Sequence, residues 1–234
     1  MSRLFTFGCS FTQYFWPTWA DILGREFSYF ENWGRQGAGN QFIFNSLVEC
    51  LLRNRLTDKD TVVIMWTNVL REDRYIGGQW ETHGNAYTAK FFKPDFLRRY
   101  FDPKGCLIRD LAVIYAARQI LESQGIRTIF LSMVPITNPE QYQQSEIRFT
   151  DSVCEIYKET IDFIRPSVFE TVFNFDWHSL RPEGSYDLHP TPLEHLKYLD
   201  LVVPEISISQ ATRQWAEQHN KDTDYQTAQP TIRF

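Results

Sequence analysis

Three short and almost wholly apolar runs constrain the fold of this chain more than any other feature. They occupy residues 4–7, 61–66 and 128–134. Stretches with the apolar spacing or the end signals of helices lie between and after them, at about residues 17–23, 41–53, 107–122 and 150–164. Strands that are apolar on both faces and alternate with helices pair in a parallel sheet covered on both sides. We therefore expect an α/β fold, with Pro17 starting the first helix and residues 168–175 forming a last strand.

The length of the chain, 234 residues, suits one domain with an elaborated cap. Residues 73–104 do not follow the alternation of strands and helices, because they are rich in aromatic and basic side chains without a clear period. We expect this insertion to be a loop or cap over the edge of the sheet. Residues 1–204 then form the domain that carries the cap, and residues 205–234 form a C-terminal helix and a polar tail.

A candidate nucleophile, Ser10, follows the first apolar run almost directly, in the sequence GCSFT. The carboxyl edge of a parallel sheet is where α/β proteins bind ligands. A serine hydroxyl becomes an effective nucleophile only when a neighbouring base takes its proton. His189 is the candidate base, because the capping box TPLE at residues 191–194 starts a helix directly after it and fixes its backbone. Asp187 is the candidate acid that orients the imidazole, as in a catalytic triad.

Acyl transfer to a serine also needs hydrogen-bond donors for the oxyanion of the tetrahedral intermediate. The sequence offers three candidates at the ends of apolar runs or in a glycine-rich turn. They are the N–H of Ser10, the N–H of Gly37 in the turn at residues 32–40, and the side-chain amide of Asn68. Asn68 follows the second apolar run directly, so we expect its amide to reach the same sheet edge as Ser10.

The order of Ser10, Gly37, Asn68 and His189 resembles that of the four motif blocks of the SGNH (GDSL-like) hydrolase superfamily. The matching blocks are residues 8–12, 32–40, 66–68 and 187–190, and the resemblance runs over residues 3–201. It implies a flavodoxin-like three-layer α/β/α sandwich around a five-stranded parallel sheet. It also implies ester hydrolysis without a cofactor.

Three departures distinguish this chain from the usual blocks. Cys9 stands where an Asp commonly precedes the nucleophile, and Trp66 and Val69 replace the Gly and Asp that usually flank the asparagine of the third block. Asp187 lies two residues before His189, where many members have a spacing of three. A Ser–His dyad supported by a backbone carbonyl therefore remains an alternative to a triad that includes Asp187.

The motifs and the implied fold predict a serine esterase that removes small acyl groups, which we expect to be acetyl, from a carbohydrate or a similar polar substrate. The side chains expected to contact the substrate are Trp66, Arg71, Arg74, Trp80 and Tyr87. Rings of the insertion would form a wall of the substrate cleft, and the alternative is that they pack only into a small core of their own. A second hypothesis is a catalytically inactive SGNH-fold module that binds a partner or serves as a structural part, in a virion if the chain is phage-encoded.

The net charge of −5 and a pI near 5.6 disfavour nucleic acid and anionic membranes as partners. No apolar stretch is long enough to span a bilayer, and the chain shows no signal peptide. We therefore expect a cytoplasmic protein, or a virion-associated one if it is phage-encoded. Its C-terminal tail is the candidate contact for an oligomeric or virion partner.

Two other chemistries have weaker support in the sequence. Cys9 is an alternative nucleophile, but its position next to Ser10 on an extended chain turns its side chain to the opposite side. A metal site could be assembled from acidic and histidine residues near the last block, namely Asp176, His178, Asp187, His189 and His195. Their spacing matches no common ligand motif, so we expect neither a metal nor a cofactor.

Overall fold

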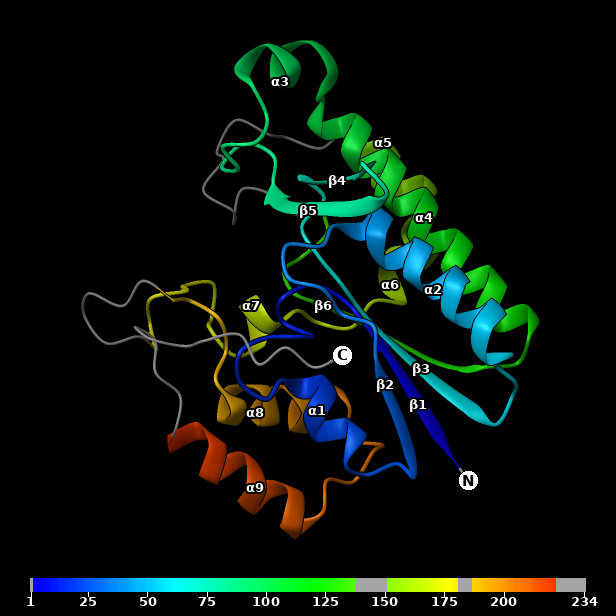
Figure 1. Ribbon diagram of the computed structural model, residues 1–234, viewed down its shortest axis with the longest axis vertical. Coiled ribbons are helices and arrows are strands. Elements are labelled where there is room, and N and C mark those ends of the chain that lie inside the picture. The colour runs from blue at the N-terminus through cyan, green and yellow to red at the C-terminus, as the bar shows by residue number, and fades with distance from the viewer. Residues whose placement is uncertain (1, 138–150, 181–186, 222–234) are drawn as a thin grey trace.

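The structure is a computed structural model that describes residues 2–137, 151–180 and 187–221. Its central sheet has four parallel strands in the order β2-β1-β3-β6 (Figure 1). They are β1 (Arg3–Phe7), β2 (Tyr29–Asn32), β3 (Asp60–Trp66) and β6 (Arg127–Ser132). The three apolar runs of the sequence are thus β1, β3 and β6. Every residue of β3 is buried, as a strand covered on both faces requires.

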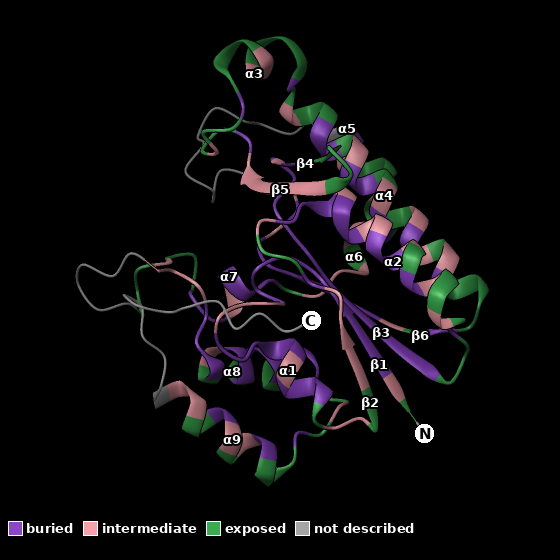
Figure 2. Ribbon diagram, viewed as in Figure 1, coloured by how far each residue is buried: buried purple, intermediate pink, exposed green. Residues whose placement is uncertain are grey.

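Helices cover both faces of the sheet, so the protein is a three-layer α/β/α sandwich (Figure 1). One layer contains α2 (Asn40–Asn54) and α4 (Pro103–Ser123), which pack against each other. The other contains α1 (Trp19–Gly24) and α8 (Pro192–Val202), with α9 (Gln210–Lys221) packed on α8. The buried residues gather in the sheet and on the sides of the helices that face it (Figure 2). The predicted fold class is confirmed.

The prediction of a strand at residues 168–175 was wrong, because this segment begins as a helix, α7 (Val168–Thr171). A capping box formed by Ser167 and Glu170 starts the helix. The position of a fifth strand beside β6 holds an isolated bridge between Phe130 and Ile164. The sheet within the described residues therefore has four strands rather than the five that the family resemblance implied.

Three predicted helices differ in their limits from those observed, and one of them, α4, begins at Pro103 rather than at about residue 107. The first begins at Trp19 rather than at Pro17, because Thr18 and Asp21 form a capping box that sets its start. The segment at residues 150–164 is divided at Tyr157 into two short helices. These are α5 (Asp151–Ile156) and α6 (Lys158–Asp162).

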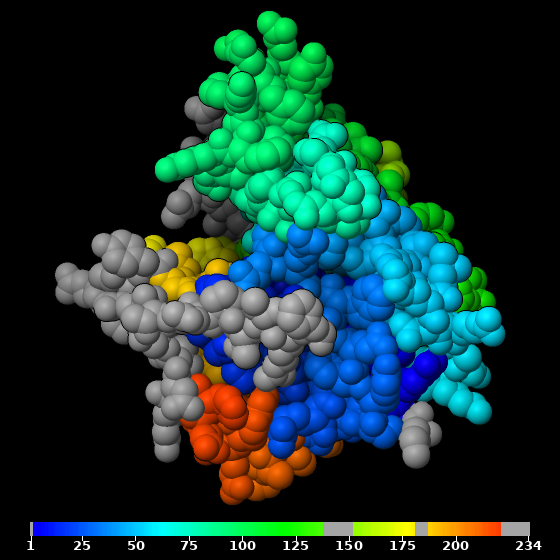
Figure 3. All heavy atoms as spheres, in the orientation of Figure 1, coloured from blue at the N-terminus to red at the C-terminus, as the bar shows by residue number. Residues whose placement is uncertain are grey.

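The insertion at residues 73–104 is a folded unit. It contains most of an antiparallel hairpin, β4 (Arg71–Ile76) and β5 (Gln79–Asn85), followed by α3 (Pro94–Tyr100) and the start of α4. The hairpin and α3 stand out as a lobe at the top of the space-filling view (Figure 3). Rings pack within this lobe, as where His83 stacks on Phe91 with centroids 3.9 Å apart. None of the helices in the described ranges is long and apolar enough to span a membrane.

Candidate active site

Ser10 lies in a tight turn at the carboxyl end of β1, and only 6% of its surface is exposed. The carbonyl of Cys9 accepts the N–H of Thr12 at 2.9 Å and closes this turn. Ser10 Oγ lies 2.9 Å from Nε2 of His189. Cys9 is turned inward instead, since it is fully buried with its Sγ 3.6 Å from Sδ of Met133. The serine, and not the cysteine, therefore faces the histidine.

The imidazole of His189 is held from its other side by Asp187. Oδ1 of Asp187 lies 2.7 Å from Nδ1 of the ring and also accepts the backbone N–H of His189 at 2.8 Å. A ring nitrogen that faces a carboxylate carries the proton, which leaves Nε2 with a lone pair toward Ser10. The loop itself is anchored by Trp16, whose Nε1 donates to the carbonyl of Pro190 at 2.7 Å. The spacing of two residues thus allows the acid to reach the ring.

Asp187 is held in its ionised form. Burial alone would raise its pKa, but hydrogen bonds from His189 and from the hydroxyl of Tyr14 outweigh burial and bring the pKa below the usual range. Tyr14 Oη donates to Oδ2 of Asp187 at 2.5 Å, and its ring stacks on the imidazole of His189. Tyr14 was not predicted from the sequence, because 173 positions separate it from Asp187 and no local pattern links the two.

Gly37 lies in the turn after β2, which is bonded to the segment that carries Ser10. The N–H of Arg35 in this turn donates to the carbonyl of Gly8 at 3.0 Å. Gly37 has a φ of +73°, a backbone conformation that favours glycine. A Cβ at this position would lie 2.2 Å from the carbonyl oxygen of Thr82 in the hairpin. Both the backbone conformation and the close approach of the hairpin therefore require glycine here.

Asn68 follows β3, the strand that pairs with β1, so it lies at the same edge of the sheet as Ser10. Its side chain is nearly buried, and its Oδ1 accepts the N–H of Leu70 at 2.8 Å. This bond fixes which end of the amide faces the backbone. The donor end, Nδ2, is the end that can serve a ligand.

Neither a protein-family model nor a curated protein matches the sequence. Among solved structures, a catalytic mutant of an acetylxylan esterase from Geobacillus stearothermophilus is similar with a TM-score of 0.51 and 14% identity, over 88% of this chain and 94% of that chain. The chain has the SGNH hydrolase fold. A lipolytic protein of the G-D-S-L family from Veillonella parvula gives a TM-score of 0.45 and 14% identity, over 86% of this chain and 98% of that chain. Another lipolytic protein of the G-D-S-L family, from Desulfitobacterium hafniense, gives a TM-score of 0.48 and 15% identity, over 85% of this chain and 98% of that chain.

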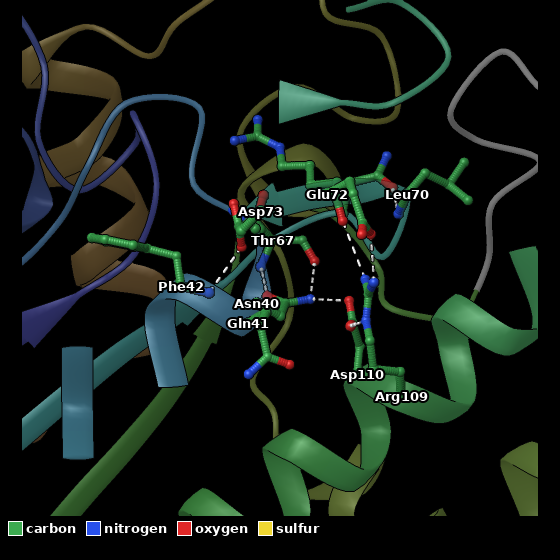
Figure 4. A network of polar contacts seen from close by, with 12 residues as sticks. Asn40, Gln41, Phe42, Thr67, Leu70, Glu72, Asp73, Arg109 and Asp110 are labelled. Carbon is green, nitrogen blue, oxygen red and sulfur yellow. Dashed lines mark hydrogen bonds and ion pairs between the residues drawn. The ribbon is translucent and has the colours of Figure 1, made fainter. Parts of the chain in front are cut away.

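In this SGNH fold, a buried polar network holds the glycine-rich turn against the end of β3 (Figure 4). Asn40 Oδ1 accepts the N–H of Thr67 at 2.8 Å, and Asn40 Nδ2 donates to the carbonyl of Thr67 at 3.0 Å and to Oδ2 of Asp110 at 2.7 Å. Burial raises the pKa of Asp110 to about 6. Because Thr67 directly precedes Asn68, the network fixes the positions of two candidate oxyanion donors relative to each other.

The network continues into the hairpin, where Asp73 caps the start of α2 (Figure 4). Its two carboxylate oxygens accept the N–H groups of Gly39 and Phe42, each at 2.8 Å. Arg109 joins the two halves of the network through ion pairs of 2.6 Å with Glu72 and 2.7 Å with Asp110. These residues could not be predicted from the sequence, because they come from segments that only the fold brings together.

Trp66 cannot contact a substrate, so its prediction as a substrate-binding residue was wrong. It is fully buried and packs edge-on against Phe130, with ring centroids 5.4 Å apart. As a residue of β3, it lies in the strand that is covered on both faces. Arg71 is nearer to the site, because its Nη1 donates to the carbonyl of Ala38 in the glycine-rich turn at 3.0 Å.

The other three side chains predicted to bind substrate belong to the hairpin lobe. Arg74 forms an ion pair of 2.6 Å with Glu72. Trp80 packs edge-on against Phe42 of α2, with centroids 5.8 Å apart, and Tyr87 packs against another ring of the lobe. These contacts fit the alternative in which the rings of the insertion form a small core of their own.

A groove of about 600 Å³ is linked to the candidate catalytic group through Tyr14, which lines the groove and contacts Asp187 and His189. Its lining includes the rings of Tyr14, Phe15 and Trp33 and the carboxylates of Asp21 and Glu31. Within the ranges that the structure describes, no three His, Cys, Asp or Glu side chains come together as a set of metal ligands. The four cysteines are free thiols.

Proposed function

We propose that the protein is a serine esterase of SGNH type in which Ser10 is the nucleophile, His189 the general base and Asp187 the acid that orients the base. The observation that carries the proposal is the distance of 2.9 Å between Ser10 Oγ and His189 Nε2. At this distance a hydroxyl can transfer its proton to the imidazole as it attacks a carbonyl carbon. A wide separation of these two atoms would favour the hypothesis of an inactive module. In the structure they lie within hydrogen-bond distance.

In the proposed reaction, Ser10 Oγ attacks the acyl carbon while its proton passes to Nε2 of His189. The N–H groups of Ser10 and Gly37 and the Nδ2 of Asn68 stabilise the oxyanion that forms. The intermediate collapses, the alcohol leaves with the proton of His189, and the acyl group stays on the serine. Water, deprotonated by the same imidazole, then releases the acid. Asp187 holds the Nδ1–H throughout and remains ionised.

Covalent labelling tests the assignment of the nucleophile. We expect a fluorophosphonate probe to modify Ser10 and to stop hydrolysis of p-nitrophenyl acetate, because the probe reacts with activated serines. Peptide mass spectrometry locates the label. Ser10→Ala should remain unlabelled, whereas Ser28→Ala, which removes an exposed hydroxyl ahead of β2, should be labelled like the wild type. A folded wild-type protein that is not labelled, or is labelled at another residue, would contradict the proposal.

For the substrate, we infer a small acyl ester, with acetyl the expected group, on a carbohydrate or similar polar alcohol. The groove beside Tyr14 supports this class, because aromatic rings pack on the apolar faces of sugars and carboxylates accept hydrogen bonds from their hydroxyl groups. The structural similarity to an acetylxylan esterase is consistent with it. Trp33 is the ring of the groove that we expect to bind the sugar, with Glu31 fixing its indole through a hydrogen bond of 2.8 Å.

Trp33→Leu is expected to lower kcat/KM for acetylated xylo-oligosaccharides about fivefold more than for p-nitrophenyl acetate, since one stacking contact contributes about 1 kcal/mol. Trp80→Leu is the matched control in the hairpin lobe. We expect it to lower both activities alike, together with the melting temperature, because Trp80 packs on α2. Equal losses on both substrates in Trp33→Leu would argue against the groove. A selective loss in Trp80→Leu would instead assign the substrate wall to the hairpin.

A further inference from the structure

Tyr14 contacts two members of the proposed catalytic group at once. It lies four residues after Ser10, between β1 and α1. Its Oη donates to Oδ2 of Asp187 at 2.5 Å. Its ring lies face to face with the imidazole of His189, with centroids 3.8 Å apart and an angle of 17° between the planes. A single side chain from the N-terminal part of the chain thus touches both the acid and the base of the last block.

The short spacing between Asp187 and His189 makes such a contact necessary. Oδ1 of Asp187 already accepts both Nδ1–H and the backbone N–H of His189. Oδ2 therefore needs a partner of its own, because the side chain is only 14% exposed and a buried carboxylate oxygen without a donor is costly. The hydroxyl of Tyr14 is that donor. It also prevents the carboxylate from rotating away from the ring.

We propose that Tyr14 is a positioning residue of the active site, which holds the Asp187 carboxylate with its hydroxyl and the His189 imidazole with the face of its ring. The proposal rests on the esterase function proposed above. Tyr14 acts through Asp187 and His189 and takes no part in bond making at the acyl carbon.

The ring of Tyr14 also stabilises the charge that forms during the reaction. When His189 accepts the proton of Ser10, the resulting imidazolium lies on the π face of the tyrosine, which attracts a cation. The hydroxyl keeps its own proton, because burial and the neighbouring Asp187 raise the pKa of Tyr14 well above its usual range. Tyr14 therefore remains a hydrogen-bond donor throughout and transfers no proton.

Neighbouring rings fix Tyr14 in this orientation. Trp16 packs edge-on against it, and Phe15 lies on it at a tilt, each with ring centroids 4.6 Å apart from those of Tyr14. Trp16 also donates to the carbonyl of Pro190, the residue after His189. The loop that carries Tyr14 and the loop that carries the histidine are thereby joined at two points.

Two substitutions separate the role of the hydroxyl from that of the ring. Tyr14→Phe removes only the hydroxyl, and we expect it to lower kcat for p-nitrophenyl acetate about tenfold with little change in KM. Tyr14→Leu also removes the ring, and we expect a loss of about 100-fold. Tyr29→Phe is the matched control, because the Tyr29 hydroxyl also donates to a carboxylate, that of Glu31, on the exposed edge strand β2. It should keep the wild-type kcat.

Proton NMR gives a second measurement that does not depend on turnover. The Nδ1–H of His189, assigned by its loss in His189→Gln, should give a downfield signal in the wild type and exchange with water at least ~10-fold faster in Tyr14→Phe. Tyr29→Phe should leave this exchange rate unchanged. If the wild type neither hydrolyses esters nor is labelled at Ser10, the esterase function fails, while the exchange rate still tests Tyr14.

A wild-type kcat together with a wild-type exchange rate in Tyr14→Phe would overturn the positioning role. The same conclusion follows if Tyr29→Phe loses as much activity as Tyr14→Phe. A loss of kcat that only follows the fraction of unfolded protein, measured by circular dichroism at the assay temperature, would likewise assign Tyr14 a purely structural role.

Discussion

Ser10→Ala and His189→Ala are each expected to lower kcat/KM for p-nitrophenyl acetate by about 10⁴- to 10⁶-fold, and the double variant is expected to fall no further. The reason is that the two side chains act as one unit. Without the serine there is no nucleophile for the imidazole to activate, and without the imidazole the hydroxyl keeps its proton. The distance of 2.9 Å between Oγ and Nε2 is the structural basis for this coupling. Initial-rate kinetics on the four proteins measures it.

Asp187→Asn extends the same test to the choice between a triad and a dyad. A triad predicts a loss of about 10³- to 10⁴-fold, because an amide at this position favours the wrong tautomer of His189. A dyad predicts a loss of less than about tenfold. Ser28→Ala serves as the control and should keep full activity.

For the Ser10 and His189 variants, losses that simply multiply in the double variant would show that the two residues do not act together.

Gly37→Ala is the second change with a large expected effect, on both stability and activity. A residue with a side chain at a φ of +73° is strained by about 1 kcal/mol or more, and the new Cβ would lie 2.2 Å from the carbonyl oxygen of Thr82. The turn or the hairpin must therefore move. We expect a loss of about 3 kcal/mol in the free energy of unfolding and about 10²- to 10³-fold in kcat, because a displaced turn removes one oxyanion donor.

Gly78→Ala at the tip of the hairpin is the matched control for this prediction. Gly78 also has a positive φ, +86°, but no atom lies within 4 Å of a Cβ built there. It should therefore lose only the cost of backbone strain, about 1 kcal/mol, and keep its kcat. Urea denaturation and initial rates measure both quantities. A Gly37→Ala variant with the stability and kcat of Gly78→Ala would show that the turn does not need the close approach to the hairpin.

The two errors in predicting the sheet have different causes. The strand β2 escaped prediction because it has four residues and none of them is buried, so its sequence shows neither an apolar run nor alternation. Residues 168–175 are apolar enough for a strand, but the capping box at Ser167 and Glu170 turns their start into a helix. The same kind of box at residues 191–194 was recognised and forms the start of α8.

Some residues of the candidate site could be predicted from local sequence patterns, whereas others were revealed only by their tertiary contacts. Ser10 and His189 could be singled out as candidates because each stands beside a strong signal, the end of an apolar run or the start of a capped helix. Trp66 was wrongly placed at the substrate, since a strand residue at the end of an apolar run can face either the core or the cleft. Tyr14 and Asn40 were not found, because their partners Asp187 and Asp110 are distant in the sequence.

The sequence by itself determined the α/β class, the three apolar strands β1, β3 and β6, and the order of the motif blocks. Burial of apolar runs, helix capping and glycine at a turn depend on residues that are close neighbours in the chain, so their patterns are visible in one sequence. Only the tertiary structure decided which polar side chains meet. The hydroxyl of Tyr14 on Asp187, the amide of Asn40 on Asp110 and the burial of Trp66 depend on how separate elements pack, and no local pattern encodes that packing.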